Sequence, residues 1–287
     1  MASIPIRKDP GGFRTVELAN ARILANLVLD FEELVLRNLA RVKGRELASL
    51  IPSSISSKFW KAALVVPSPS ELMMMFDTVD QVEMVLDKEP ASRAAQRIVW
   101  TAQAHGIKWA TQNLIRAGLE KPDQVAWAGG GKFGITDKIP SPTTARPFTL
   151  PPDPKMIALY KERVQSEIKA LTSAQSTAIK RAITLGFQKG ETVQQIAKRV
   201  KGVTEMAKSK AVTIARTETL AAGNAAAKQR YSDAGVEKVE WIAAYDDRIC
   251  EECESLHGNI YPIGDTPEIP VHPNCRCTLI PYREKEE

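Results

Sequence analysis

The chain has 287 residues, of which 44% are hydrophobic and 25% are charged. These proportions are ordinary for a globular protein and exclude a largely disordered chain, a collagen-like repeat and a small disulfide-dense domain. No apolar run approaches the roughly 18 to 20 residues needed to cross a bilayer, and the first residues lack the apolar core of a signal peptide, which is roughly 7 to 15 residues long. We therefore expect a protein that is made in a cytoplasm, stays soluble and has no membrane partner.

The net charge of +5 is unevenly distributed along the chain. Residues 1–154 carry 19 basic and 16 acidic side chains, residues 155–230 carry 15 and 5, and residues 231–287 carry 5 and 13. The basic block favours contact with nucleic acid or with an acidic protein surface. No aromatic residues alternate with the basic ones as stacking platforms, so these cations can also simply solvate the outer faces of helices. The cations that we single out are Lys198, Arg199, Lys201, Lys208 and Lys210.

The first part of the chain is expected to be a helical N-terminal region, residues 1–118, because apolar residues recur there at the spacing of one helix face. The helices that this spacing predicts are 13–50, 71–88 and 91–118. Ser70 is expected to be the N-cap of the second. Residues 119–154 then contain seven prolines and four glycines, which predicts a linker or an extended arm.

The third part, residues 155–287, is expected to be a helical domain that ends in a small β module. The predicted helices are 155–170, 174–189, 192–200 and 205–234, and Thr192 with Gln195 fits a capping box. Three short strands are predicted at 236–242, 259–263 and 278–282. We call residues 236–282 the cysteine module. The fold class is therefore mainly α, with a small α+β domain at the C-terminal end.

All four cysteines fall within 28 residues of this module. Cys250 and Cys253 form one close pair, and His272, Cys275 and Cys277 follow. Two tight ligand groups on separate turns are typical of a tetrahedral zinc site, and a cytoplasmic protein keeps its thiols reduced. The zinc set is either the four cysteines or His272 in place of one of the last three. Disulfides or free thiols remain the alternative. A zinc ion or a disulfide would each cross-link, and so stabilise, a module with little core of its own.

Several polar residues stand near the cysteines. Arg216, Thr217 and Glu218 lie mid-helix, Asn224 follows two turns later, and Asp246 and Arg248 precede the first cysteine pair. In one hypothesis Glu218 and Arg248 act as an acid/base pair or a substrate clamp. In the other, the mid-helix residues bond the irregular loop that packs over them and satisfy its backbone groups.

Segment 211–282 contains an ordered series of short elements. They are Ile214-Ala215-Arg216-Thr217-Glu218-Thr219, Asn224, Tyr231, Gly235-Val236, Trp241, Asp246-x-Arg248-x-Cys250-x-x-Cys253, Leu256-His257-Gly258 and His272-Pro273-Asn274-Cys275-Arg276-Cys277. In this order and spacing the segment resembles the phage Mu F-like family, the minor head or head morphogenesis proteins of tailed bacteriophages. The resemblance is dense over the C-terminal quarter and loose from about residue 155.

The resemblance implies a structural minor capsid protein that is associated with the portal vertex and acts in head assembly, with DNA packaging or ejection as a further role. It implies a place in the virion, in the head interior or at the portal vertex, after assembly in the host cytoplasm. The implied partners are the portal protein and the major capsid protein. The basic residues singled out above are candidates for contact with the portal or with packaged DNA, and a homo-oligomer stays open.

Two other functions are kept as alternatives. One is a zinc-stapled nuclease that uses His257, His272 and Asn274; with only three histidines in the chain, this set of catalytic groups is thin. The other is a stand-alone DNA-binding module that uses the basic helices of residues 155–230. Because no credible active site is present, we expect the protein not to be an enzyme.

Overall fold

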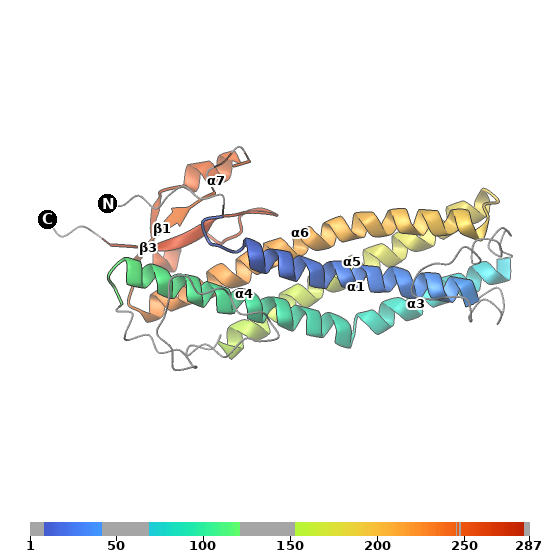
Figure 1. Cartoon of the computed structure of the whole chain (residues 1–287), viewed down its shortest axis with the longest axis horizontal. Helices are drawn as coiled ribbons and strands as arrows, with labels where there is room; N and C mark the ends of the chain where they lie inside the picture. The colour runs from blue at the N-terminus through green and yellow to red at the C-terminus, as the bar shows by residue number, and fades with distance from the viewer. Residues whose placement is uncertain (1–8, 42–68, 121–152, 245, 247, 284–287) are drawn as a thin grey trace. The chain divides into compact units, whose positions relative to one another are not determined.

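The computed structural model describes residues 9–41, 69–120, 153–244, 246 and 248–283 (Figure 1). It confirms the fold class: these residues are mainly helical, with one small antiparallel sheet near the C-terminus. The helices are α1 (Arg14–Arg41), α3 (Pro69–Leu86), α4 (Glu89–Arg116), α5 (Pro154–Gln188), α6 (Val193–Asp233) and α7 (Glu251–Leu256). The strands are β1 (Lys238–Ile242), β2 (Ile260–Pro262) and β3 (Thr278–Tyr282), and a short 3-10 helix, η2 (Ile263–Asp265), follows β2.

The helices of the N-terminal region lie close to their predicted ranges. The last part of the helix predicted at 13–50 falls outside the described residues, as does most of the predicted linker. The prediction that Ser70 is an N-cap is wrong, because α3 already includes Pro69. Proline is well tolerated in the first turn of a helix, where its missing N–H would have no partner.

Four helices were predicted in residues 155–234, but the structure has two long ones. The predicted break after residue 170 is absent: α5 continues through Leu171 and Thr172, which are both buried, and the Thr172 hydroxyl lies 3.0 Å from the Lys169 carbonyl of its own helix. The break near Gly202 is absent as well. Glycine costs a helix about 1 kcal/mol relative to alanine, and burial of neighbouring Val200 and Thr204 compensates for this cost.

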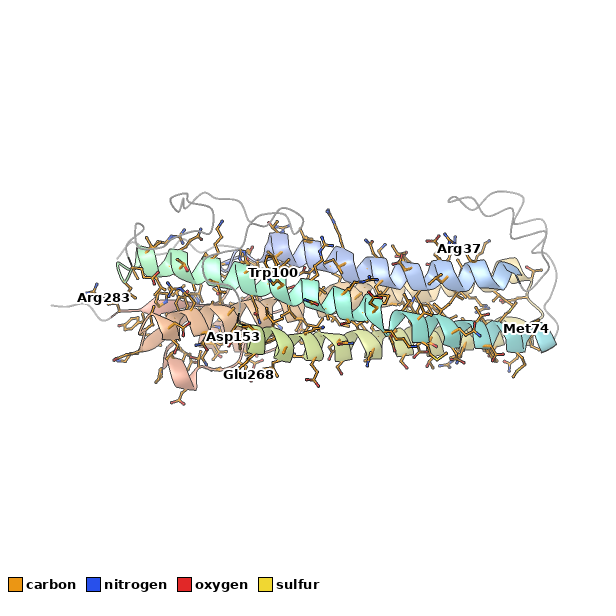
Figure 2. All side chains as sticks on the ribbon, turned by 90° about the horizontal axis from the view of Figure 1, so that it is seen from below. Arg37, Met74, Trp100, Asp153, Glu268 and Arg283 are labelled. Atoms are coloured by element: carbon orange, nitrogen blue, oxygen red, sulfur yellow. The ribbon has the colours of Figure 1, made fainter. Side chains whose placement is uncertain are left out.

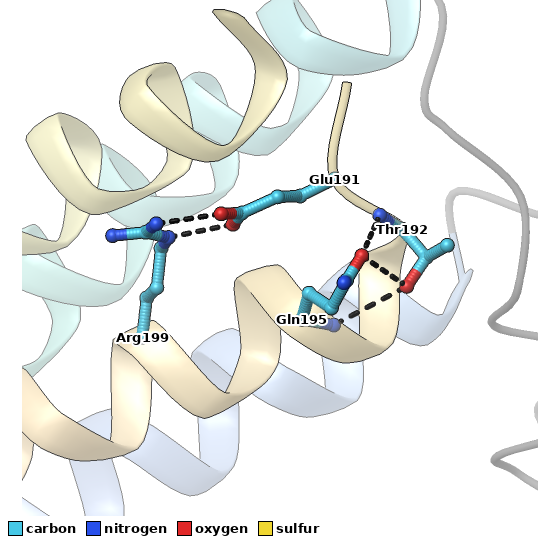
Figure 3. Close-up of polar contacts among 4 residues, drawn as sticks. All are labelled: Glu191, Thr192, Gln195 and Arg199. Atoms are coloured by element: carbon cyan, nitrogen blue, oxygen red, sulfur yellow. Dashed lines mark hydrogen bonds and ion pairs between the residues drawn. The ribbon is translucent and has the colours of Figure 1, made fainter. Parts of the chain in front are cut away.

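The start of α6 is set by the predicted capping box, which Figure 3 shows. The Thr192 N–H donates to Gln195 Oε1 at 2.8 Å, and the Gln195 N–H donates to Thr192 Oγ1 at 3.4 Å. Just outside, Arg199 makes a two-pronged ion pair with Glu191, at 2.5 and 2.6 Å. The two bonds of the capping box satisfy backbone N–H donors that the start of the helix leaves without a partner, whereas the ion pair joins side chains only.

The chain divides into two compact units. The first contains residues 1–21, 96–164 and 213–287, and the second contains residues 22–95 and 165–212. Each unit thus combines residues from the N-terminal helices with residues from α5 and α6. The division into domains at 118 and 155 stays a prediction.

The second unit has a helical core of its own. Leu24, Val28, Phe31 and Val35 of α1 are buried at alternating spacings of four and three residues, the pattern of one helix face. A Gln175 side chain from α5 donates to the Val28 carbonyl at 3.3 Å. On α3, Met74, labelled in Figure 2, is 47% exposed, whereas the next residue, Met75, is fully buried.

In the first unit the sheet has the strand order β2-β1-β3, with both pairs antiparallel. Val239 of β1 stands opposite Tyr261 of β2 and Pro281 of β3. The sheet shares one hydrophobic cluster with α4 and α6, which contribute Trp109, Leu114, Leu220 and Tyr231 among others. The three predicted strands are therefore confirmed, and helical side chains supply the core that the cysteine module lacks.

Within this unit α4 and α6 approach each other at two glycines. A Cβ added to Gly106 would lie 1.9 Å from the Gly223 carbonyl oxygen, and a Cβ added to Gly223 would lie 2.1 Å from the ring of Phe13. That ring also packs against His105 at a centroid distance of 4.5 Å. The N-terminal end of α1 is thus held on a crossing that only residues without a side chain permit.

Candidate functional site

The four cysteines and His272 gather beside the sheet, on two short turns. In the first turn Cys250 is the N-cap of α7, and its sulfur accepts the Cys253 N–H at 3.3 Å. Cys250 is half-buried, whereas Cys253 is only 4% exposed. This cap places the two sulfurs of the Cys-x-x-Cys pair next to one another.

The second turn is built by His272-Pro273-Asn274-Cys275. The Cys275 N–H donates to the His272 carbonyl at 3.2 Å, and Asn274 has a φ of 59°. Proline at the second position and asparagine with positive φ at the third are features of a type II turn. Cys277 follows directly before β3 and is buried, as is Cys275.

The distances between the donor atoms are short. His272 Nε2 lies 3.2 Å from Cys250 Sγ and 3.0 Å from Cys253 Sγ, and Cys253 Sγ lies 3.9 Å from Cys275 Sγ. Two groups of three, Cys250–Cys253–His272 and Cys253–Cys275–Cys277, have all their donor atoms within 4.8 Å of one another. Cys253 belongs to both groups, and all four cysteines are free thiols.

The tautomer of His272 follows from its second nitrogen. Nδ1 lies 2.9 Å from the Pro273 carbonyl oxygen, which can only accept, so Nδ1 carries the hydrogen. In the neutral ring the lone pair of Nε2 is then directed at the thiols. This is the usual arrangement of a metal-ligating histidine, whose other nitrogen is held by a backbone carbonyl.

The thiols differ in acidity. Hydrogen bonds from the side chain and then the backbone N–H of Cys277 lower the pKa of Cys275 to about 5, against the effect of burial. The hydrogen bond to Cys275 and burial raise the pKa of Cys277, and burial raises the pKa of Cys253 to about 12. Soft sulfur and imidazole donors of this kind suit Zn²⁺ and not the hard cations Mg²⁺ and Ca²⁺.

Two of the polar residues predicted near the cysteines tie their loops to α6. The Asn224 amide donates to the Cys277 carbonyl at 3.3 Å and accepts from the Thr278 hydroxyl at 2.9 Å. The Thr217 hydroxyl accepts the N–H of Asn274, at 3.2 Å. Polar residues of α6 thus hold the His272–Cys277 segment at Asn274 and at its last residue, Cys277.

The charged residues do not form the Glu218–Arg248 pair that the acid/base hypothesis requires. Buried Glu218 accepts from Arg163 of α5, with Nε–O distances of 2.9 and 3.2 Å. Arg248 donates to Asp246 at 3.3 Å. Asp246 also accepts two bonds from Arg276, at 2.6 and 2.7 Å, and these bonds hold its pKa well below the ordinary value. Glu218 and Arg248 thus each have a partner other than the one that this hypothesis requires.

Trp241 and the nuclease candidates take up structural positions. The Trp241 side chain is fully buried in the cluster beneath the sheet. Nδ1 of His257 accepts the Ala243 N–H at 3.2 Å, which binds the end of α7 to the end of β1. Asn274 occupies the left-handed turn position described above, and His272 stands among the thiols.

The predicted contact cations lie on α6 in the second unit. Lys198 and Lys210 are exposed. Arg199 is bound to Glu191, Lys208 lies 4.0 Å from Glu205, and Lys201 is half-buried. Of these five cations, the two at the ends of the stretch are exposed and two of the others have an acidic partner.

Sequence reasoning missed the support around the N-terminal end of α1. Nε2 of His105 lies 2.9 Å from the Gly11 carbonyl oxygen, which can only accept, so Nε2 carries the hydrogen. Glu17 is partly buried, and burial followed by the nearby Asp9 raises its pKa to about 7. Gly106 and Gly223 were the signal in the sequence, because each lies inside a predicted helix. A glycine at such a position often marks a close approach of two backbones.

Comparison with known proteins finds a family match in the C-terminal region. Residues 177–280 match the family model described as Phage Mu protein F like protein, which confirms the resemblance found in the sequence. The match covers the C-terminal part of α5, all of α6 and the cysteine module up to β3. Among the residues that the structure describes, no helix is both long and apolar enough to span a membrane.

Two relatives share a part of this chain. An uncharacterised protein of Haemophilus influenzae is 26% identical over 137 residues, which make up 46% of this chain and 30% of that protein. An uncharacterised protein of Methanocaldococcus jannaschii is 28% identical over 135 residues, 46% of this chain and 21% of that protein. The match thus spans less than a third of either relative. No solved structure gives a significant match.

Proposed function

We propose that this protein is a structural component of a bacteriophage head that acts at the portal vertex during head assembly. The observation that carries the proposal is the match of residues 177–280 to the Phage Mu protein F like family. These residues include the motif residues of α6 and of the two cysteine turns. The portal protein and the major capsid protein are the proposed partners, and the virion is the proposed location.

The hydrogen bonds that the motif residues form also agree with a structural role. Asn224 and Thr217 bond the backbone of the cysteine module, and Asp246 is held by two arginines. Such groups fix the shape of a loop, whereas catalytic groups point into a cleft where a substrate can lie. We therefore propose a protein without enzymatic activity.

We further propose that one zinc ion cross-links the cysteine module. The residues able to hold it are Cys250, Cys253, His272, Cys275 and Cys277. A zinc ion with four protein ligands has no open position for water, so its role here would be to bind the two turns together. Two of the candidate ligands precede β2 in the chain and three follow it. The ion would therefore also hold the segments on either end of β2 together and so stabilise the sheet.

The exposed cations Lys198 and Lys210 are proposed to contact packaged DNA or an acidic face of the portal. If DNA is the partner, the affinity should fall steeply between low and moderate salt, because binding releases counterions from the phosphates. Replacing both lysines with glutamine should reduce the slope of that dependence by about one for each phosphate that is no longer bound. Absence of DNA binding at low salt would leave the portal as the partner.

The proposed function is tested by quantitative mass spectrometry of purified phage particles and empty proheads. We expect the chain at a low copy number in proheads, counted against the portal protein as the internal standard. A lower number in full particles than in proheads would show that it leaves the head before or during DNA packaging. Absence from both particles would refute the structural role.

A further inference from the structure

The first unit contains a small cavity that is lined by residues outside the cysteine module. Its volume is about 100 Å³, and it lies between α4, the N-terminal end of α5 and the last turns of α6. We propose that this cavity binds the primary carboxamide of an asparagine or glutamine side chain from a partner protein. The inference is independent of the zinc site and goes beyond the proposed function, because it assigns a binding site and the chemical group that the site accepts.

Two buried side chains of the cavity wall have hydrogen-bonding atoms that are not used. Gln103 is fully buried, and neither Nε2 nor Oε1 of its amide has a partner among the residues that the structure describes. Arg230 is 8% exposed; its guanidinium is bound to Glu120, but its Nε–H is unpaired within the same described ranges. Buried polar groups nearly always have a partner, so unpaired atoms in a cavity wall indicate that the cavity receives a group that pairs with them.

These three atoms define the chemistry of the ligand. Gln103 Nε2 and Arg230 Nε are donors, and Gln103 Oε1 is an acceptor. A primary carboxamide offers the complementary set, because its carbonyl oxygen has two lone pairs for the donors and its NH₂ group can donate to the acceptor. A carboxylate has no hydrogen for Gln103 Oε1, and an ammonium group has no lone pair for the two donors.

The size of the cavity agrees with this group. An apolar cavity of about 150 Å³ binds benzene, so in proportion a cavity of about 100 Å³ holds about four non-hydrogen atoms. That is the size of a carboxamide together with the CH₂ group that carries it. The half-buried side chains of Ile107 and Met156 and the buried Ala226 provide an apolar wall for this CH₂ group.

The exposed side of the cavity is polar and carries two carboxylates. Asp153, labelled in Figure 2, accepts the Lys155 N–H at 2.9 Å, and Asp233 accepts from the Gln229 amide at 2.8 Å. Both carboxylates are exposed and keep further lone pairs, which can accept backbone N–H groups beside an inserted side chain. Their charge disfavours an anionic ligand. This exposed side therefore favours a carboxamide that is presented by a polypeptide.

The test is an NMR titration of the isotope-labelled full-length protein with three probes of the same shape, acetamide, acetate and acetamidinium. Acetamide should shift the side-chain NH₂ signals of Gln103 and bind at least about tenfold more tightly than the two charged probes, because each of these leaves a buried group unpaired. N-methylacetamide resembles a backbone peptide group and should bind more weakly than acetamide, since its extra methyl group exceeds the available volume. A short peptide with a central glutamine should bind more tightly than acetamide, and the same peptide with glutamate should lose this gain.

Gln103→Met keeps an unbranched side chain of similar length but removes both amide functions, so it should weaken acetamide binding at least about tenfold. Gln229→Met is the matched control. It makes the same replacement at an exposed amide of the same cavity that already has Asp233 as its partner, and it should leave the affinity close to that of the wild type.

The probe series on the wild-type protein decides the proposal even where a variant fails to fold. Equal affinities for acetamide and either charged probe would overturn it, as would tighter binding of N-methylacetamide or no gain for the glutamine peptide. A folded Gln103→Met protein that binds acetamide like the wild type would overturn it as well. No response to any probe would show that water alone occupies the cavity.

Discussion

Asn224 illustrates how single polar side chains on α6 organise the cysteine module. Its amide accepts from Thr278 and donates to the Cys277 carbonyl, more than fifty residues away in the chain. Buried polar groups are stabilising only when they find such partners. At the residue scale, Asn224 donates one N–H within α6 and the other to the module, and its oxygen accepts from the module as well.

At Gly106 the addition of a single methyl group should lower the stability of the protein. We expect Gly106→Ala to destabilise the first unit by about 1–3 kcal/mol, because its Cβ would meet the Gly223 carbonyl and backbone atoms must move. Thermal or denaturant unfolding of the variant measures this cost.

Gly202→Ala is the matched control for that experiment. It is also a glycine within a helix, but nothing lies within 4 Å of an added Cβ. Alanine should therefore stabilise α6 by about 0.5–1 kcal/mol through helix propensity alone. Equal effects of the two substitutions would contradict the close helix approach.

Glu17 should make the stability of the first unit depend on pH. Its pKa is raised from 4.5 to about 7 by burial and by Asp9. Folding therefore takes up a proton between these two values, so the contribution of Glu17 is fully present below pH 4.5 and is lost as the pH rises through 7.

The variant Glu17→Gln cannot ionise and should lack this contribution to the pH dependence. Melting temperatures of both proteins should thus agree most closely near pH 4, and the variant should be the more stable protein at pH 8. A constant difference across this range would show that the Glu17 carboxyl titrates normally in the folded protein.

At the scale of secondary structure, glycines and a capping box mark the ends of the long helices α5 and α6. Gly190, with a φ of 63°, lies between them, and Gly235, with a φ of 74°, follows the end of α6. The capping box at Thr192 then defines where α6 begins. Helix ends are thus decided by local bonds, whereas helix continuity is decided by burial.

Thr192→Ala should destabilise the second unit by about 0.5–2 kcal/mol, because it removes the side-chain acceptor of the box. Thr184→Ala is the control: its hydroxyl donates to the Lys180 carbonyl inside α5, and its loss should change stability by no more than about 0.5 kcal/mol. Hydrogen exchange at the start of α6 locates the effect. Unaltered exchange there in Thr192→Ala would mean that the box does not fix the helix start.

At the scale of the whole molecule, the two units should respond differently to metal. If zinc is bound as proposed, Cys250→Ser or removal of zinc by a chelator should destabilise the cysteine module by several kcal/mol. Loss of hydrogen-exchange protection should then be confined to the first unit, chiefly β1 to β3. Residues 165–188 of α5 in the second unit serve as the internal control. Unchanged melting with no bound zinc would contradict the prediction.

The amino-acid sequence by itself determined the features that depend on neighbours in the chain. Helical periodicity, three short strands, the capping box and the clustering of cysteines were all predicted from it, because each depends on spacings of a few residues. The sequence also carried the family resemblance. The limits of α5 and α6 were predicted less well, since Thr172 and Gly202 are tolerated once their neighbours are buried.

Only the tertiary structure decided which distant residues meet. The pairing of Glu218 with Arg163, the bond from Asn274 to Thr217 and the approach of Gly106 to Gly223 join positions 55 or more residues apart. Such contacts depend on how whole helices pack, which no local spacing encodes. For the same reason the sequence left five candidate donors at the cysteine site, and only the folded turns give the two groups of three in which their donor atoms lie close together.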